Sequence, residues 1–600
     1  MSSVTRRSFA LFPTPFRLQT SNCSGFSRKL SVFHTQRSYI RPSYECSKSA
    51  HALNGSTIGA MLQQQVERQP DRDMLVCRED NVRLTYQAFK EKMDDLAAGL
   101  IALGVKPGDR VGIWSPNRSE WVLTQFATAA IGAILVTINP AYRVHELEYA
   151  LNKVGVTTLI MAESFKTQDY YNMVFELCPE LSTCSPGKLK SQRLPTLQTV
   201  VVMGDTKKQG SFSFDDVCRL STKELRLEIE NVEKKLNFDQ PINIQFTSGT
   251  TGNPKAATLT HHNILNNASF VGHRMGYDQE HATICIPVPL YHCFGMVCGV
   301  MTTPVFGSTC VLPSKAFNPV ASLEAVQAER CNTLYGTPTM FIDMLHVPNF
   351  DTYDKSSLEK GIMAGAPCPV EVMKDVISKL NIPKACVAYG STETSPVSFL
   401  SFPDTPLEKR CDSIGYVLDH TEAKIVDESG HVVPRGENGE LCTRGYSTML
   451  GYWEDKAKTD AAISPTRWYH SGDIGSMDED GYVKLNGRMK DMIIRGGENI
   501  YPVEIEQFLH THPSVEDVQV VGLPDKRMGE EICASIKLKD GMTLTEQEVK
   551  DFCKGEISHF KIPRYVVFAD QFPLTVTGKV LKYQMRAELI QQFSLENENA

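Results

Sequence analysis

Hydrophobic and polar positions along the chain fall into a helical pattern near the start and then into an alternation of strands and helices. From 57 to 103 apolar residues recur mainly at helical spacing, and Gly104 predicts where this region ends. The segments that follow are strand-like at 110–114, 133–138 and 157–161, and helical at 120–130 and 144–151. Strands that alternate with helices of this length predict an α/β fold with a parallel, doubly wound sheet covered on both faces.

Residues 282–314 form a long segment without Asp, Glu, Lys or Arg. Its length requires a membrane span to be considered, because about 20 apolar residues are enough for a helix to cross a bilayer. Pro287, Pro289 and Pro304 break the segment, and proline is poorly tolerated inside a helix. We therefore expect a buried strand, a short helix and another strand here, and no transmembrane segment.

The pattern changes after Gly487-Arg488, where a compact second unit begins. Its predicted elements are a helix at 502–509, strands at 515–521 and 532–538, a helix at 546–552 and a strand at 565–568. This succession predicts a small α+β domain with a core of its own. We expect a large domain at 45–489 and this C-terminal domain at 490–600.

The first 44 residues contain no Asp or Glu, but they contain seven Lys or Arg residues among many serines. This composition is typical of a mitochondrial transit peptide and predicts import into the matrix, with a disordered basic tail as the alternative interpretation. A secretory signal would need an unbroken apolar core, whereas 9–16 is short and is interrupted by two prolines. Under the import interpretation, the mature chain begins between Arg37 and Ser47.

The composition is ordinary for a soluble globular protein, since 42% of the 600 residues are hydrophobic and 22% are charged. A net charge of −8 argues against a nucleic-acid-binding protein, which would carry a basic surplus, so we expect no nucleic-acid partner. The 17 cysteines include no C-x-x-C pair that would indicate a zinc site or a disulfide framework. Cys293 and Cys298 lie close to His292 in the sequence, but a metal site would need more ligands, so we interpret them as packing thiols.

Candidate chemistry begins in a loop of small hydroxyl residues and glycines that follows a strand-like segment at 242–246. The loop consists of Thr247, Ser248, Gly249, Thr250, Thr251, Gly252, Asn253, Pro254 and Lys255. Its glycines allow close backbone approach to an anion, its hydroxyls can donate hydrogen bonds and its lysine supplies a positive charge, so it is a candidate phosphate loop. A flexible surface turn is the alternative. The motor-type P-loop does not fit, because the loop lacks a Gly-Lys-Ser/Thr end.

Two further blocks place a carboxylate among small residues after a predicted strand. Glu393 follows Tyr389-Gly390-Ser391-Thr392, and an oxygen ligand of this kind beside a triphosphate suits Mg²⁺. Asp473 follows Tyr469-His470-Ser471-Gly472 and could accept hydrogen bonds from ribose hydroxyls, as acidic residues do in dinucleotide sites. A solvated loop carboxylate is the alternative for each acid.

The C-terminal region contributes two more candidate features. Gly496 and Gly497 permit close backbone approach, and Pro502 suits the start of a helix. Lys579 ends the sequence Thr575-Val576-Thr577-Gly578-Lys579, which predicts a turn near the end of the chain. An ordinary surface lysine is the alternative interpretation of Lys579.

Taken in order, these blocks resemble the motifs of the acyl-adenylate-forming superfamily, which includes acyl-CoA synthetases, luciferases and peptide-synthetase adenylation domains. The resemblance runs from about residue 57 to the end of the chain and is strongest to mitochondrial medium-chain acyl-CoA synthetases. One departure is Ala256-Ala257, where the family commonly has a glycine. The implied fold is a large N-terminal adenylating domain of doubly wound sheets with a small, mobile α+β C-terminal domain.

The resemblance also implies roles for individual residues. The implied nucleotide contacts are the phosphate loop, Ala388, Tyr389, Gly390 and Ser391 flanking adenine, Thr392 beside them, and Asp473 and Arg488 at the ribose and phosphates. The implied catalytic residues are Thr247, Glu393 as the Mg²⁺ ligand, and Lys579 as the bridge between the carboxylate and the α-phosphate. Gly365 and Ala366 would lie near the adenine and the acyl group, and His292 between the acyl pocket and the thiol channel. Gly496 and Gly497 would lie at the pantetheine channel, and Lys490 at the interdomain hinge. A satisfied core histidine is the alternative for His292.

The implied activity is ATP-dependent ligation of a fatty acid, of medium chain length, to coenzyme A through an acyl-adenylate, with release of AMP and pyrophosphate. The implied cofactors are ATP, Mg²⁺ and the co-substrate coenzyme A, and segment 282–314 could line the acyl pocket. The alternatives are an adenylating enzyme for short-chain, aryl or amino-acid substrates, and a non-catalytic nucleotide-binding scaffold. We expect no carrier domain after Lys579, and a scaffold would be expected to have lost Glu393, Arg488 or Lys579, all of which are present.

Overall fold

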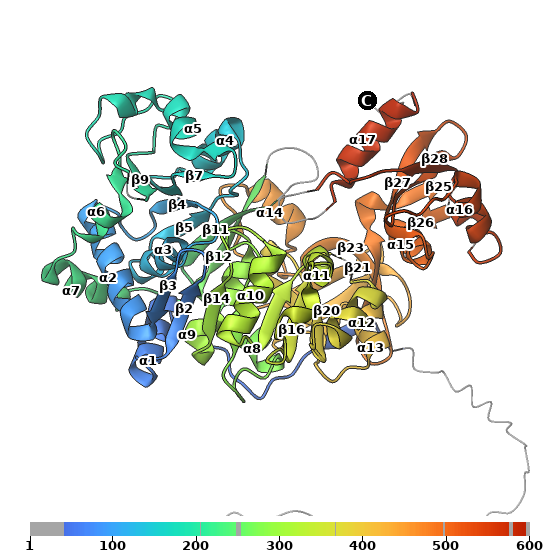
Figure 1. The fold of residues 1–600 in the computed structure, drawn as a ribbon, viewed down its shortest axis with the longest axis horizontal. Helices are drawn as coiled ribbons and strands as arrows, with labels where there is room; N and C mark the ends of the chain where they lie inside the picture. The colour runs from blue at the N-terminus through green and yellow to red at the C-terminus, as the bar shows by residue number, and fades with distance from the viewer. Residues whose placement is uncertain are drawn as a thin grey trace, which may run out of the picture. The chain divides into compact units, whose positions relative to one another are not determined.

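The computed structural model describes residues 41–204, 206–247, 254–366, 368–495, 498–557, 559–574 and 580–595. Residues 1–40, which make up most of the predicted transit peptide, lie outside this set. The described residues up to Arg488 form three sheets and a short hairpin, and those from Ile493 onward form a further sheet (Figure 1). These sheets determine where each predicted site residue lies.

The sheet that leads into the phosphate loop has eight strands, most of them parallel. In spatial order they are β10 (Phe212–Ser213), β9 (Thr199–Met203), β6 (Thr158–Ala162), β4 (Arg110–Trp114), β5 (Ile134–Thr137), β11 (Pro241–Thr247), β12 (Lys255–Thr260) and β22 (Gly451–Tyr452). Neighbours are parallel from β10 to β11, whereas β12 is antiparallel to both β11 and β22. The three predicted strands between 110 and 161 are confirmed as β4, β5 and β6.

Successive side chains of a strand point to opposite sides of a sheet, so apolar side chains on both faces of this sheet need cover. Helices cover both faces. These helices are α1 (Ile58–Arg68), α2 (Tyr86–Ala102), α3 (Ser119–Ala130), α4 (Val144–Val154) and α5 (Tyr170–Leu177) (Figure 1). Ile113 and Leu135 are buried in one core with residues of α1, α2 and α3. Val136, next to Leu135, is buried in a second core with residues of α4 and α5. The prediction of a doubly wound α/β sheet is confirmed.

A second large sheet has nine strands. In spatial order they are β19 (Tyr416–Val417), β18 (Val397–Leu400), β17 (Lys384–Gly390), β16 (Lys360–Ala364), β15 (Thr333–Gly336), β13 (Thr283–Cys285), β14 (Thr309–Leu312), β2 (Asp73–Cys77) and β3 (Val82–Thr85). The strands from β17 to β2 are parallel. The β2–β3 pair interrupts the region 57–103, where helical spacing led us to expect mainly helix; its turn contains Asn81, which has a left-handed φ of 52°.

The uncharged segment 282–314 folds as its prolines predict. It contains β13, the π-helix η2 (Phe294–Val300), helix α9 (Thr302–Phe306) and β14, and all seven residues of η2 are buried. π-Helices are rare and often occur at functional sites. Among the described residues, we find no helix whose length and apolar character would let it span a bilayer.

A third sheet, with five antiparallel strands, was not predicted from the sequence. Its strands are β1 (Tyr44–Cys46), β20 (Thr421–Val426), β21 (Gly439–Gly445), β23 (Tyr469–Met477) and β24 (Val483–Arg488). The core of this sheet contains Ala423, Leu441 and Val483. Asp473 and Arg488, both predicted nucleotide contacts, lie opposite one another on β23 and β24.

The C-terminal domain has the predicted α+β character. Its elements are β25 (Ile493–Arg495), β26 (Glu498–Ile500), α15 (Pro502–His510), β27 (Val515–Asp525), β28 (Gly529–Leu538), α16 (Glu546–Cys553), β29 (Tyr565–Phe568) and α17 (Lys582–Gln592). Ile505, Val518 and Ile536 belong to a core formed by this domain alone. All five elements predicted after Gly487 are confirmed, and β25, β26 and α17 are additional.

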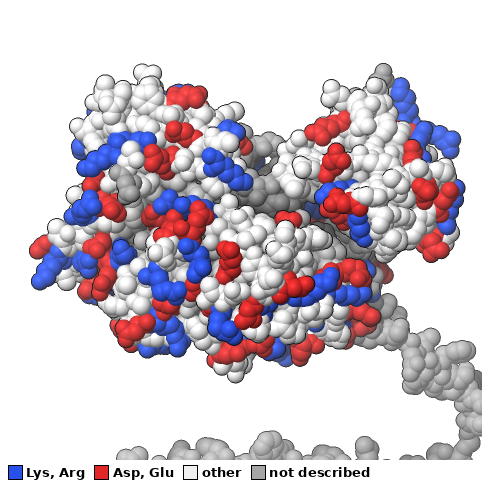
Figure 2. Space-filling view, in the orientation of Figure 1, with Lys and Arg blue, Asp and Glu red and all other residues white. Residues whose placement is uncertain are grey.

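The surface carries charges of both signs. Figure 2 shows Lys and Arg side chains interspersed with Asp and Glu over the face in view. Many of them are paired, as in the ion pairs of Arg83 with Asp73 at 2.6 Å and of Arg193 with Glu148 at 2.6 Å. This mixture matches a chain with 62 basic and 70 acidic residues.

Candidate active site

The phosphate loop connects two neighbouring strands at the end of the eight-stranded sheet. Thr247 is the last residue of β11 and Lys255 is the first of β12, and the two are paired across the strands. The carbonyl oxygen of Pro254 accepts a hydrogen bond from the Tyr149 hydroxyl at 3.1 Å. Because β11 is parallel to β5, the loop leaves the edge at which the parallel strands end, where ligands of open α/β sheets bind. Residues 248–253 lie outside the described residues.

A buried tyrosine connects the lysine of this loop to the predicted Mg²⁺ ligand. The Tyr452 hydroxyl donates a hydrogen bond to Oε1 of Glu393 at 2.8 Å, and the Nζ atom of Lys255 lies 5.0 Å from the centre of the Tyr452 ring. Burial, together with the charge of Glu393, raises the pKa of the Tyr452 hydroxyl, so it remains a donor. Glu393 and Tyr452 are 8% and 6% exposed, which keeps this arrangement away from bulk water.

The second motif contacts the segment that contains His292, which is predicted to lie by the acyl pocket. Thr392 lies beside Cys293, with 3.7 Å between Oγ1 and Sγ. His292 precedes Cys293, and its Nδ1 accepts the Phe294 N–H at 3.2 Å, at the start of η2. Burial raises the pKa of the Cys293 thiol to about 12, so the thiol stays protonated and is no nucleophile. His292 is thus placed between the Glu393 motif and η2.

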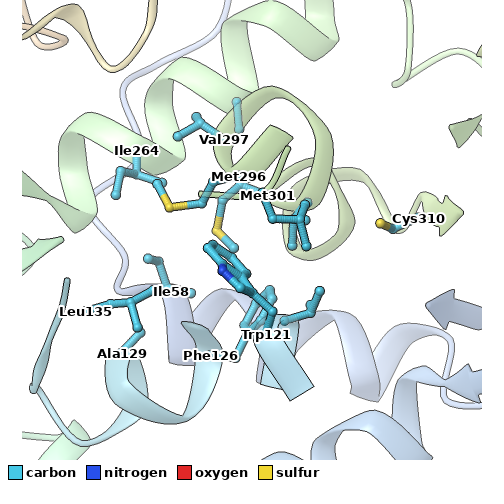
Figure 3. Close-up of a cluster of buried hydrophobic side chains, with 14 of the residues drawn as sticks. Ile58, Trp121, Phe126, Ala129, Leu135, Ile264, Met296, Val297, Met301 and Cys310 are labelled. Atoms are coloured by element: carbon cyan, nitrogen blue, oxygen red, sulfur yellow. The ribbon is translucent and has the colours of Figure 1, made fainter. Parts of the chain in front are cut away.

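From this point an apolar core extends into the domain. Figure 3 shows Trp121 of α3 pointing toward Met296 and Met301, which belong to η2 and the residue after it. The Nε2 atom of Gln245 lies 3.5 Å from Sδ of Met296, so η2 contacts the strand that leads to Thr247. The indole nitrogen of Trp121 is buried without a hydrogen-bond partner among the described residues. This core is the candidate lining for an apolar substrate.

The residues predicted around adenine lie at the ends of two adjacent parallel strands. Ala364 ends β16 and is paired with Ala388 of β17, so Gly365 and Ala366 leave the sheet beside Tyr389. Gly365 has a φ of +92°, a conformation that a side chain disfavours. At Gly390 an added Cβ would lie 1.8 Å from the carbonyl oxygen of Pro396, so no larger residue fits without a shift.

The third motif places its carboxylate against the second. Oδ2 of Asp473 accepts a short hydrogen bond from the Tyr389 hydroxyl, and Oδ1 lies 3.1 Å from Nε of Arg488. The Tyr469 hydroxyl accepts a hydrogen bond from Ser391 Oγ at 3.3 Å. Asp473 is 7% exposed and therefore held by these partners rather than by water. The structure brings Asp473 and Arg488 together with Tyr389, and Tyr469 together with Ser391.

Lys490 lies in the 3₁₀ turn η5 (Met489–Asp491), directly after the last strand of the antiparallel sheet. Burial and the neighbouring charge of Arg488 lower the pKa of its ammonium group. Of the remaining predicted residues, Ser248, Gly249, Thr250, Thr251, Gly252, Asn253, Gly496, Gly497 and Lys579 lie outside the described residues.

Tyr452 is a contact that reasoning from the sequence missed. It belongs to a strand of two residues, in which no alternation of polar and apolar positions can be seen. The available signal was its sequence context, Gly451-Tyr452-Trp453, an aromatic pair after a glycine. Its long-range pairing with Ala257 of β12, which brings it to Lys255, is not encoded in local sequence.

The donor set suits a nucleotide triphosphate with a hard cation. Mg²⁺ usually keeps several waters and is bound through one or two carboxylates plus substrate phosphates, which fits the buried carboxylate of Glu393, joined to Lys255 through Tyr452. Lys255 offers a positive charge to phosphate oxygens, and Asp473 offers acceptors to hydroxyls. The arrangement can therefore bind a nucleotide and neutralise charge that develops on its phosphates.

Comparison with known proteins identifies the chain's relatives. Residues 62–453 match the family model of the AMP-binding enzymes, and residues 504–579 match that of the AMP-binding enzyme C-terminal domain. The chain is 49% identical over 558 residues to the medium-chain acyl-CoA ligase ACSF2, mitochondrial, of Danio rerio, covering 93% of this chain and 92% of that one. It is 48% identical over 548 residues to the human protein of the same name, covering 90% and 89%.

Solved structures support the same assignment at the level of the fold. The anthranilate CoA ligase AuaEII in complex with anthranoyl-AMP matches with a TM-score of 0.80 at 24% identity, covering 90% of this chain and 98% of that one. ATP-bound MatB from Rhodopseudomonas palustris matches with a TM-score of 0.77 at 24% identity, covering 90% and 100%. With the family model matching most of its large domain and close relatives spanning nearly its whole length, the chain belongs to the AMP-binding enzyme family.

Proposed function

We propose that the chain is an ATP-dependent fatty acid:CoA ligase that forms an acyl-adenylate and then an acyl-CoA thioester. The observation that carries this proposal is that buried tyrosines join three motifs far apart in the sequence. Tyr452 joins Lys255 to Glu393, and Tyr389 reaches Asp473. The proposal is supported by relatives named medium-chain acyl-CoA ligases, at 48–50% identity over about nine-tenths of the chain.

In the first step, a carboxylate oxygen of the fatty acid bonds to the α-phosphorus of ATP, and the bond to the β-phosphate breaks with its electron pair on pyrophosphate. Two anions must approach each other, so catalysis depends on groups that neutralise charge as the bond forms. In our proposal the phosphate loop with Thr247 and Lys255 binds the phosphates, Asp473 and Arg488 orient the ribose and the α-phosphate, and Lys579 bridges the two reacting anions.

The Mg²⁺ ion proposed for this site supplies charge neutralisation at the phosphates when bound. Glu393 is the residue that would hold it, with Tyr452 fixing one carboxylate oxygen through the 2.8 Å hydrogen bond. The low exposure of Glu393 strengthens its interaction with a cation, because fewer waters compete.

In the second step, the coenzyme A thiolate attacks the acyl carbon, the bond to the phosphate oxygen breaks, and AMP leaves. We propose that the C-terminal domain (490–600) turns about Lys490 between the steps, which removes Lys579 and brings Gly496 and Gly497 to the pantetheine channel. Domain movements of this kind let one site serve two half-reactions.

We propose a medium-chain fatty acid as the substrate, bound in the apolar core behind His292, Gly365 and Ala366. The relatives' names support this choice. Met296 and Met301 face Trp121 there, and methionine side chains adapt readily to an apolar ligand (Figure 3). A short-chain, aryl or amino-acid substrate remains the second candidate within the same chemistry.

The test of this function is ATP- and coenzyme A-dependent thioester formation by the purified protein with free acids from acetate to palmitate. We expect a maximum of kcat/KM at intermediate chain lengths, with one AMP released for each thioester, because the acyl-adenylate is the common intermediate. AMP release without thioester would indicate another acyl acceptor. No AMP release with any acid would contradict the proposed function.

We also propose that residues before the large domain act as a mitochondrial transit peptide, with the matrix as the destination; the relatives named mitochondrial support the compartment. The described residues favour a boundary before Arg41 rather than at residue 44. Ser43 is fully buried and its N–H donates to the Val433 carbonyl oxygen at 2.8 Å, while β1 pairs with β20. A guanidinium nitrogen of Arg435 donates to the Tyr44 carbonyl oxygen at 3.1 Å.

Deletion of residues 1–46 is therefore expected to lower the melting temperature, whereas deletion of 1–40 leaves it unchanged. The longer deletion removes β1 with its pairing to β20, and the buried Ser43 with its hydrogen bond to Val433. Each lost hydrogen bond costs roughly 0.5–1.5 kcal/mol. Differential scanning calorimetry of the two truncated proteins measures the difference. Equal melting temperatures would show that β1 is dispensable and would remove the reason to place the boundary before Arg41.

A further inference from the structure

The Asp473 carboxylate is positioned by an irregularity in the antiparallel sheet. On β21, Glu440 pairs with Ile474 and Cys442 pairs with His470, so a step of two residues on β21 faces a step of four on β23. The extra residues of β23 leave the ladder as a bulge immediately before Ile474. Bulges next to active sites commonly redirect a side chain, and here the redirected side chain is Asp473.

The side chain of Glu440 contacts the bulged segment of β23. Its Oε1 accepts the Gly472 N–H at 3.1 Å, and its Oε2 lies 2.7 Å from Nδ1 of His470, which donates to it. Gly472 has a φ of +70°, a backbone conformation that a hydrogen bond to its N–H helps to fix. The Glu440 side chain is 17% exposed, so water competes only weakly for these contacts.

Ser471, the residue before Gly472, fixes the backbone at Asp473. Ser471 Oγ donates to the Leu441 carbonyl oxygen at 2.6 Å and accepts the Asp473 N–H at 3.0 Å. Glu440 and Ser471 thus bind the two peptide groups that flank Gly472, one on each side. The Asp473 carboxylate itself contacts Tyr389 and Arg488, and Glu440 does not touch it.

We propose that Glu440 is a positioning residue for nucleotide binding, which holds the bulge at Gly472 so that the Asp473 carboxylate faces the ribose hydroxyls of ATP. This inference rests on the proposed function, in which Asp473 binds the ribose. Glu440 acts on affinity for the ribose rather than on the chemical steps, because its side chain contacts Gly472 and His470, which lie just before Asp473 on β23.

The experiment compares binding of ATP and of 2′,3′-dideoxy-ATP, which lacks both hydroxyls, to the full chain by isothermal titration calorimetry. The wild-type protein is expected to bind the dideoxy nucleotide roughly tenfold or more weakly, since hydrogen bonds to a charged group are lost. In Glu440→Ala we expect ATP affinity to fall by about tenfold, with dideoxy-ATP affinity nearly unchanged, so that the ratio of the two approaches one.

Three further variants make the result specific. Glu440→Gln keeps an acceptor for Gly472 and is expected to retain most of the wild-type ratio. Glu440→Asp keeps the charge, but its carboxylate is one methylene closer to the backbone. We expect the ratio of ATP affinity to dideoxy-ATP affinity to approach one in this variant. It replaces the alanine variant in the test if that variant is too unstable to measure. Glu422→Ala is the control, because Glu422 belongs to the same sheet and pairs with Arg444 at 2.7 Å, away from the bulge.

The outcomes separate the inference from the function on which it rests. A wild-type ratio near one, or no ATP binding, contradicts the proposed role of Asp473. A wild-type ratio of tenfold that persists in both Glu440→Ala and Glu440→Asp overturns the role of Glu440. Equal losses of ATP and dideoxy-ATP affinity would show that Glu440 only stabilises the fold, and would overturn it as well.

Discussion

Replacing Glu393 by alanine is expected to lower the rate of acyl-adenylate formation by roughly 10²–10³-fold, the range typical for loss of one group that stabilises transition-state charge. Glu393 is a buried carboxylate joined to Lys255 through Tyr452, and its Oε1 is fixed by the Tyr452 hydroxyl. Without it, the pyrophosphate leaving group loses the proposed cation ligand. Single-turnover release of pyrophosphate at saturating ATP and fatty acid measures the effect.

Two matched variants show whether the effect belongs to the site. Tyr452→Phe removes the hydrogen bond to Glu393 but leaves the ring beside Lys255, so its loss should be smaller, about tenfold. Glu359→Ala removes a carboxylate at the opposite end of β17, where Glu359 pairs with Lys384, and should leave the rate unchanged. A Glu393→Ala rate within threefold of the wild type would exclude the proposed role of this carboxylate.

Replacing Lys579 by alanine is expected to separate the two half-reactions. The lysine is proposed to bridge the carboxylate and the α-phosphate only while the adenylate forms, so adenylation should fall by roughly 10²–10³-fold. Thioester formation from preformed acyl-adenylate and coenzyme A should remain close to the wild-type rate, because the C-terminal domain has then turned away. Rapid-quench measurements of each half-reaction give the two rates independently.

Lys554→Ala serves as the control for this variant. Lys554 is an exposed lysine of the same domain, 61% exposed at its side chain and paired with Asp551, so its removal should affect neither half-reaction. If Lys579→Ala slows both half-reactions by the same factor, the lysine has no step-specific role and the proposed domain movement loses its support.

Much of the fold could be predicted because its elements carry local signals. The strands β4, β5 and β6 are short apolar runs between helical patterns, and the five elements between Pro502 and Phe568 are equally distinct. The antiparallel sheet was not predicted, because its strands contain glycines and polar residues, as in Gly439–Gly445, and because its edge strand β1 pairs with β20, which is far away in the sequence. Local periodicity contains no information about such pairing.

The candidate site shows the same division. Loops such as Gly365-Ala366 and Tyr389-Gly390 could be found because small residues gather where strands end. Tyr452 and Glu440 could not, because each acts only through residues brought to it by strand pairing: Tyr452 through β12, and Glu440 through the bulge of β23. A glutamate or tyrosine in a short strand has no signature of its own in a single sequence.

The separate core of the C-terminal domain has an evolutionary consequence. Among the described residues, the hydrophobic clusters of this domain include no residue that precedes Ile493, and those of the large domain include none that follows Arg488. A substitution in one core therefore needs no compensating change in the other. Each domain can thus accumulate substitutions at its own rate. Selection can change the C-terminal domain, which we propose moves, while the packing of the large domain is preserved.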